Sequence, residues 1–535
     1  MDPDLIVEAE TVLTVDDDFS TADAFAVYDD TIGEVGTAAE ITALAGPDTT
    51  HLEATDKTVL PGFIDAHCHM VNAGRRQYLE VDLSPERVSS FDEMVETLAA
   101  EAEETPEGEW IRGHSHDDTK LEEGRHPTRE VLDRASTEHP IFITPAGGHV
   151  SMVNTLALEM AGVDADTPDP DGGHFEREDD GYPNGILHEA ARDRFRGGGD
   201  HAGLIPDPTP EEDQEALKEI CAYYNAQGIT SVGEAVVGPN EIRMYRDGVK
   251  QDNLTVRGYL MILHDHFENL NELQIDSGFG DEMVKIGLIK NFVDGAIAAR
   301  TAYLNEPYEG RDDRGDLVIT QEELNKQVME AHKAGYQIGV HANGDAAIEM
   351  LLEAYERALE AHPREDHRHR IEHATMITED ILDRIEALDL CVLPFSTYIY
   401  QHGDDKLGEY GDRLDRMFPY GSYSDRDIPI GGSSDHSAGL LPPLLGIRTM
   451  VTRKTRSGDT ISPHEAIDVE EAIRIYTADA AYCAFEEDLK GSIEPGKLAD
   501  FIILSDDPTA VDPDDIHEID VERTFLGGEE VHSKA

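Results

Sequence analysis

Short apolar runs alternate with amphipathic stretches through the middle of this 535-residue chain. One apolar run leads into the histidines at the end of residues 61–69, and seven later runs also have the length of strands. These later runs are Ile229–Ala235, Val256–Leu263, Val284–Phe292, Gln337–Ala342, His369–Ala374, Cys391–Phe395 and Ile428–Asp435. The stretches between them have a helical pattern; 321–334 is one example, with Thr320 as a candidate N-cap. Eight strands alternating with helices predict an α/β fold, a (β/α)8 TIM-like barrel.

The two ends of the chain share a different pattern. Short strands separated by turn residues fill residues 5–60, and the same pattern returns only at 499–504 and 523–528. We therefore expect both ends to build one small β-sandwich domain, although two separate terminal modules would give the same pattern. The predicted domains are 1–60 together with 485–535 for the composite β-sandwich, and 61–484 for the barrel.

Residues 85–205 do not fit the count of barrel strands. They contain a helical stretch at Phe91–Glu104, strands at 110–113 and 141–144, and a Gly/Pro/Asp-rich segment from 168 to 185. We expect an insertion after the first barrel strand, which would form a lid or a wall of the substrate pocket.

The chain is strongly acidic. It has 113 Asp and Glu against 43 Lys and Arg, a formal charge of −70. Its many apolar runs argue against disorder. Such a surface repels itself unless salt screens it, and at about 1 M salt the Debye length is only roughly 3 Å. We therefore expect a halophilic protein, adapted to a high-salt cell, that binds neither nucleic acid nor anionic membranes.

The cysteines and the apolar segments bear on the compartment. The four cysteines are far apart and form no Cys-x-x-Cys pair, as is typical of reduced thiols. The N-terminus has no signal-peptide pattern, and no apolar run approaches the roughly 20 residues that span a bilayer. We expect a cytoplasmic protein.

Several predicted strand ends carry groups that bind metals. In a strand, His67 and His69 point to the same face, which makes either half of a metal site or a chance pair of polar residues. Each of the other candidates also has an ordinary structural explanation, but the carboxyl ends of barrel strands converge, and the order of residue types along successive strands favours a shared site. The other candidates are Lys290, His341, His373 and Asp435.

These motifs together resemble the amidohydrolase superfamily, and within it the YtcJ-like (amidohydrolase type 3) family, whose relatives include N-substituted formamide deformylases. The resemblance covers nearly the full length. Its motifs are 61–69 (PGFIDAHCH), 148–154 (GHVSMVN), 290–295 (KNFVDG), 340–345 (VHANGD), 370–374 (RIEHA), 432–435 (GSSD) and 491–500 (GSIEPGKLAD). The segment 296–300 departs from the small residues usual there, which affects the pocket rather than the ligands.

The resemblance implies two divalent metal ions, most often zinc. His67, His69 and Asp435 would hold one ion, His341 and His373 the other, and Lys290, carbamylated by CO₂, would bridge them. A free ammonium has no lone pair, whereas a carbamate offers two anionic oxygens. A hydroxide shared by the metals would attack the substrate carbonyl.

The chemistry of such a site, together with nearby residue types, suggests which residues act on the substrate. Asp435 would move the proton from the water to the leaving nitrogen. His149 would stabilise the oxyanion, or instead play a structural role beside Asn154. Arg300 would contact a substrate carboxylate or form a salt bridge, and Glu189 would lie at the pocket rim.

The expected function is hydrolysis of an amide or formamide C–N bond in a small molecule, by a possible homodimer. Deamination, cyclic-amide opening and lactone hydrolysis are alternatives on the same metal pair. A non-catalytic regulatory or binding protein on the same scaffold is an alternative of another class, against which the complete set of six ligands argues.

Overall fold

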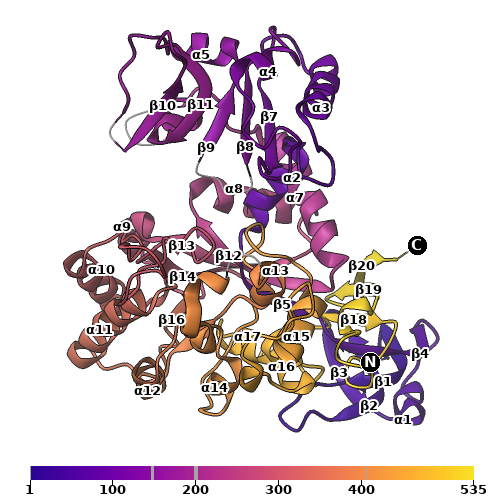
Figure 1. The fold of residues 1–535 in the computed structure, drawn as a ribbon. Coiled ribbons are helices and arrows are strands. Elements are labelled where there is room, and N and C mark those ends of the chain that lie inside the picture. Colours follow the sequence, from indigo (N-terminus) through magenta and orange to yellow (C-terminus); the bar gives the residue numbers. More distant parts are fainter. Residues whose placement is uncertain (1, 146–149, 171, 198–202, 405–406, 535) are drawn as a thin grey trace. The chain divides into compact units, whose positions relative to one another are not determined.

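A computed structural model describes residues 2–145, 150–170, 172–197, 203–404 and 407–534 (Figure 1). The chain divides into two compact units. The first combines Met1–Val71 with Ile220–Ala535, and the second is Asn72–Glu219. All the predicted metal ligands belong to the first unit.

A seven-stranded parallel sheet organises the first unit. Neighbouring strands follow the order β17-β16-β15-β14-β13-β12-β5. Their bounds are Phe63–Cys68 (β5), Ile229–Val237 (β12), Arg257–Leu263 (β13), Val284–Phe292 (β14), Gln337–Ala342 (β15), Arg370–His373 (β16) and Cys391–Leu393 (β17). The sequence predicted a strand in each of these places. The result is an α/β fold with a nearly closed, barrel-like sheet.

The eighth predicted strand, 428–435, is not a regular strand. It makes isolated parallel bridges, pairing Ile430 with Val392 of β17 and Ser433 with Phe395. On its other side the Ala66 N–H donates to Gly432 O at 2.8 Å. The segment thus lies between β17 and β5, but Gly431 and Gly432 interrupt its ladder, and a side chain at 432 would come 2.8 Å from the Tyr476 ring. The prediction of eight regular strands was wrong for this segment.

Helices follow the strands as the alternating pattern predicted. Three of them are α10 (Gln321–Lys333), α11 (Asp345–Ala361) and α12 (Glu379–Ala387). The Thr320 hydroxyl accepts a hydrogen bond from the Glu323 N–H, which confirms the predicted N-cap. The other α-helices of seven or more described residues that lie wholly in this unit are α8 (Pro239–Lys250), α9 (Phe267–Leu273), α15 (Pro443–Thr452) and α16 (Val469–Ile475).

Strands from both ends of the chain share a second sheet, with indigo and yellow strands side by side in Figure 1. Its order is β20-β19-β18-β4-β1-β2-β3. The bounds are Leu5–Leu13 (β1), Thr21–Tyr28 (β2), Thr31–Gly36 (β3), Thr50–Pro61 (β4), Phe501–Leu504 (β18), Val521–Leu526 (β19) and Glu529–Ser533 (β20). Phe501 packs against Phe25, with ring centroids 5.1 Å apart, and stacks on Phe525 at 4.3 Å. These contacts join the ends of the chain in one core, while the two-layered sandwich remains a prediction.

The second unit contains a six-stranded sheet in the order β10-β11-β9-β8-β7-β6. Its strands are Val81–Asp82 (β6), Ile111–His116 (β7), Ile141–Pro145 (β8), Val150–Val153 (β9), Gly173–Arg177 (β10) and Pro183–Glu189 (β11). Helix α3 spans Phe91–Glu104, as its sequence pattern predicted. The stretch 85–205 lies within this unit, and its role as a lid remains a prediction.

None of the helices in the described residues is long and apolar enough to cross a membrane.

Candidate metal centre

Three predicted ligands converge where β5, β16 and the segment 428–435 end. One ligand atom each from His67, His373 and Asp435 lies within 4.8 Å of the other two. His67 is on β5, His373 is the last residue of β16, and Asp435 follows the bridges that join its segment to β17. All three side chains are buried. This trio is a candidate metal site made of two imidazoles and a carboxylate.

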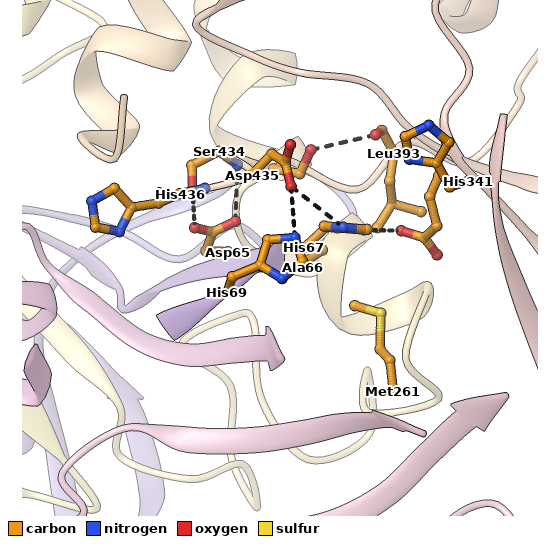
Figure 2. A network of polar contacts seen from close by, with 12 residues as sticks. Asp65, Ala66, His67, His69, Met261, His341, Leu393, Ser434, Asp435 and His436 are labelled. Atoms are coloured by element: carbon orange, nitrogen blue, oxygen red, sulfur yellow. Dashed lines mark hydrogen bonds and ion pairs between the residues drawn. The ribbon is translucent and has the colours of Figure 1, made fainter. Parts of the chain in front are cut away.

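His69 lies beside this trio, just after β5. Its Nε2 is 3.2 Å from Asp435 Oδ1, and His67 Nε2 is 3.6 Å from the same oxygen. Figure 2 shows the Asp435 carboxylate joined to both imidazoles by dashed lines. Burial pushes the pKa of Asp435 upward, but the hydrogen bond and charge of His69 outweigh it and keep this pKa below its usual range. Asp435 is therefore a carboxylate ready to bind a cation.

A buried carboxylate fixes the tautomer of His67. Glu372 on β16 contacts His67 Nδ1 through Oε2. Burial pushes the pKa of Glu372 upward, but Arg370 and His67 lower it well below its usual range. An ionised carboxylate only accepts hydrogen bonds, so His67 Nδ1 carries the proton and Nε2 presents its lone pair toward Asp435. A lone pair facing a carboxylate oxygen is an arrangement that a cation would stabilise.

Arg370 holds Glu372 in place. Its Nε donates to Glu372 Oε1 at 2.8 Å, and its Nη2 donates to Oε2 at 3.0 Å and to Ala66 O at 2.9 Å. Gly339 on β15 makes room for this carboxylate, because a side chain at 339 would clash with Glu372 Oε1. Arg370 and Glu372 were not among the site residues predicted from the sequence. Two opposite charges in the strand that ends at His373 could have indicated a buried ion pair beside the ligand.

A second carboxylate, that of Asp65, holds the turn that carries Asp435. Asp65 on β5 accepts hydrogen bonds from the Ser434 N–H at 3.0 Å and from the Ser434 hydroxyl at 2.5 Å (Figure 2). The Asp435 N–H donates to His67 O at 2.9 Å. Burial raises the pKa of Asp65 to about 7. These bonds tie the turn that carries Asp435 to the strand that carries His67.

The backbone at this site adopts left-handed conformations. The φ angles are +75° at His373, +39° at Ala374 and +52° at Asp435. Residues other than glycine rarely adopt them, and the surrounding contacts must hold them in place. They orient two of the three converging ligands.

Lys290 is fully buried on β14, directly opposite Gly339 of β15. Its Nζ has no hydrogen-bond partner among the described residues and lies 4.5 Å from the centre of the Phe292 ring. Burial lowers the pKa of this amine to about 8, although the nearby Glu372 and Asp435 act in the opposite direction. About a tenth of the amine is therefore uncharged at pH 7, far more than for an ordinary lysine, and the neutral amine is the form that reacts with CO₂.

His341 on β15 completes the set. His341 Nε2 lies 3.1 Å from Gly295 O, which can only accept, and 3.1 Å from Asn343 Nδ2, which itself donates to Gly295 O. With the proton on Nε2 and shared with Gly295 O, Nδ1 keeps its lone pair. The His341 and His373 ring centroids are 4.5 Å apart. Burial and the Lys290 charge lower the pKa of His341 to about 3, so this imidazole is a neutral potential ligand.

Two buried polar atoms of the site, Lys290 Nζ and His373 Nδ1, make no hydrogen bond within the part of the chain that the structure describes. Beside them, Asp435 Oδ1 faces the imidazole nitrogens of His67 and His69. Unpaired buried polar atoms are costly and rare, and their gathering beside neutral imidazoles and a carboxylate fits a divalent metal such as zinc. Part of the site remains open to solvent, since the His69 side chain is 25% exposed and His341 14%.

The remaining predicted residues are placed differently. His149 lies outside the described residues. Arg300 is in the loop after β14, where its backbone φ is +59°. Glu189 ends β11 in the second unit. A hollow of about 1500 Å³ in the described part of the chain has none of the six candidate ligands in its lining.

This chain is similar to known proteins over most of its length. Residues 52–532 match the model of the family described as "Amidohydrolase family". An N-substituted formamide deformylase from Arthrobacter pascens is 31% identical, covering 98% of this chain and 97% of that protein. YtcJ from Bacillus subtilis (strain 168) is 29% identical, covering 91% and 92%. An uncharacterized metal-dependent hydrolase from Pyrococcus horikoshii OT3 has a similar structure, with a TM-score of 0.80, 23% identity, and coverage of 95% and 99%.

Proposed function

The chain belongs to the amidohydrolase family of hydrolytic enzymes, as its motifs predicted, and from this premise we propose that it hydrolyses the C–N bond of an amide or formamide in a small molecule. The observation that carries the proposal is the convergence of His67, His373 and Asp435 within 4.8 Å. The formamide deformylase of Arthrobacter pascens, at 31% identity over nearly the whole chain, favours formamides within this class.

The proposed site takes two divalent metal ions, with zinc as the proposed metal. His67, His69 and Asp435 would hold one, and His341 and His373 the other. Bound zinc would do two things that no side chain here can do. It would lower the pKa of a bound water to about 7, and it would act as a Lewis acid on the substrate carbonyl.

Asp435 is the proposed proton carrier. Its carboxylate faces two imidazoles, and its side chain is 12% exposed, so it reaches both the buried ligands and an incoming substrate. Its lowered pKa keeps it ionised in the resting enzyme and able to accept a proton. The same group returns that proton to the leaving nitrogen, because an amine leaves only once its nitrogen is protonated.

Lys290 is the proposed bridging ligand in its carbamylated form. Carbamylation joins the neutral amine to CO₂ with loss of one proton and converts a buried potential cation into an anion. The unpaired Nζ and its lowered pKa support this modification. ¹³C-bicarbonate should give a carbamate signal in the NMR spectrum that is absent in Lys290→Ala; equal signals in both proteins would contradict the assignment.

A substrate panel tests the function. Protein purified in salt, stripped with a chelator and reloaded with zinc is offered formanilide, N-butylformamide, acetanilide, hydantoin and a γ-lactone. We expect release of formate and amine from the N-formyl compounds, loss of turnover on stripping, and a fall of about 10²-fold or more in Asp435→Asn after it is reloaded to the zinc content of the wild type. Turnover of the lactone alone, or formamide turnover that does not depend on metal, would overturn the proposal.

A further inference from the structure

An aromatic wall borders the candidate metal centre. The Phe395 ring, just beyond β17, stacks on the imidazole of His373 with centroids 4.3 Å apart and ring planes 9° from parallel. Tyr398 packs against Phe395 at 5.0 Å and against Phe418 at 5.1 Å. The ring of Phe395 thus lies between Tyr398 and the candidate metal ligand His373.

Tyr398 begins the short helix α13 (Tyr398–His402), which is fastened to the loop after Asp435. The Thr397 hydroxyl donates to Leu440 O at 3.2 Å, and Gln401 Nε2 donates to Ala438 O at 3.3 Å. The Ala438 N–H in turn donates to Asp435 O at 2.7 Å. The start of α13 and the proposed proton carrier therefore belong to one hydrogen-bonded unit.

The Tyr398 hydroxyl faces the loop that follows Lys290. The residue is 6% exposed, and the Ala298 N–H lies close enough to its oxygen to stabilise the phenolate form. Burial raises the pKa of Tyr398 above its usual range, and the negative charge of Asp435 adds to this effect, as expected for two groups close together. The hydroxyl is thus near the loop after β14 and within range of the charge of Asp435.

The proton of this hydroxyl has no acceptor in the described part of the chain, and the nearby Ala298 N–H is itself a donor and cannot provide one. Neighbouring buried tyrosines behave differently. The Tyr308 hydroxyl donates to Ala302 O at 2.7 Å, and the Tyr410 hydroxyl donates to Ile297 O at 2.8 Å. Folded proteins rarely leave a buried donor without an acceptor, and the exceptions gather where a ligand supplies the missing partner.

We propose that the Tyr398 O–H donates a hydrogen bond to the acyl oxygen of the substrate, beside His373. This inference rests on the proposed amide or formamide hydrolysis. The acyl oxygen gains negative charge as the tetrahedral intermediate forms, and a fixed donor among aromatic rings stabilises that charge more than water does. No covalent step involves Tyr398, which remains a neutral donor throughout.

The placement narrows the substrate class. A carbonyl oxygen can accept the Tyr398 proton, whereas the C=N carbon attacked in the deamination of a ring carries no such oxygen. The rings of Phe395 and Phe418 pack against the ring of Tyr398 and offer no charged group to a substrate there. We therefore infer an uncharged acyl group, such as formyl or acetyl, at this position.

Tyr398→Phe removes the donor and keeps the ring, and Tyr308→Phe is the matched control because its hydroxyl already has a protein acceptor. We expect kcat/KM for formanilide to fall about 10²–10³-fold in Tyr398→Phe, as for other donors to a developing oxyanion. The melting temperature of metal-free Tyr398→Phe should equal or exceed that of the wild type, because no protein hydrogen bond is lost. Tyr308→Phe should melt at a lower temperature and retain activity.

Acetohydroxamic acid gives a readout that does not depend on turnover. Its affinity for the zinc-loaded protein should be about three- to tenfold weaker in Tyr398→Phe and unchanged in Tyr308→Phe. A fall in melting temperature equal to that of Tyr308→Phe, or unchanged hydroxamate affinity, would overturn the role of Tyr398. Absence of turnover of the whole panel by the wild type would overturn the proposed function instead, and the hydroxamate result would still decide the role of Tyr398.

Discussion

Replacing Glu372 with Gln should weaken both the metal-free fold and the binding of zinc. The substitution keeps the size of the side chain but removes its charge. In the wild type, Glu372 accepts two hydrogen bonds from Arg370, at 2.8 and 3.0 Å, and contacts His67 Nδ1. In Glu372→Gln an N–H₂ group must face one of these donors. The guanidinium of Arg370 is then left buried without an anion.

The magnitude follows from the geometry. Two unit charges about 3 Å apart interact by about 5 kcal/mol at an effective dielectric constant of about 20. Breaking a buried ion pair by removing one partner typically costs about 3–5 kcal/mol. His67 also loses the acceptor that fixes its tautomer, so zinc affinity should fall about 10–100-fold.

Urea unfolding of the metal-free protein measures the first effect, and competition with a chelating dye measures the second. The matched control is Glu379→Gln, because Glu379 pairs with Arg426 at 2.9 Å but its side chain is 85% exposed. We expect the control to change unfolding by about 0–1 kcal/mol and zinc affinity not at all. Equal effects of the two substitutions would refute the assignment of Glu372 as the group that orients His67.

Two further predictions concern pH and salt. His369 Nδ1 accepts a hydrogen bond from the Ile338 N–H, so the proton of this ring is on Nε2, which donates to His332 Nδ1 at 2.8 Å. His332 Nε2 in turn donates to His362 O at 2.7 Å. This chain of hydrogen bonds requires both imidazole rings to be neutral. Because burial lowers the pKa of both rings, this contribution to stability is complete above about pH 6.5 and is lost as the pH falls below it, by about 1.4 kcal/mol per pH unit for each ring. Urea midpoints from pH 7.5 to 5.5 should therefore fall less steeply in His332→Gln, and equal slopes would contradict the scheme. With a formal charge of −70, the melting temperature should rise between 0.2 and 3 M KCl, and a flat or falling series would remove the case for salt adaptation.

Much of this architecture could be predicted from the sequence because its signals are local. Apolar runs of strand length marked all seven strands of the barrel-like sheet, and the N-cap at Thr320 was correct. Metal-binding side chains at successive strand ends predicted a site, because parallel strands place their carboxyl ends at one edge. His67, His373 and Asp435 do meet there.

The structure of the segment 428–435 could not be predicted from its local sequence. Its apolar residues suggested a strand, but Gly432 faces the Tyr476 ring, a neighbour some forty residues further along the chain. Strand regularity depends on such contacts, which no local pattern contains. The prediction of a regular eighth strand failed for that reason.

The sequence by itself determined the strand order, the candidate ligands and the family, because each is encoded in residue type and spacing along the chain. The tertiary structure decided what those residues can do. Glu372 is an ordinary acid in the sequence, and only its burial between Arg370 and His67 makes it the group that sets the protonation of a ligand. The Tyr398 hydroxyl is likewise distinguished only by lacking the acceptor that Tyr308 has. Hydrogen-bond partners and desolvation come from contacts between distant parts of the chain, so they exist only once the chain has folded.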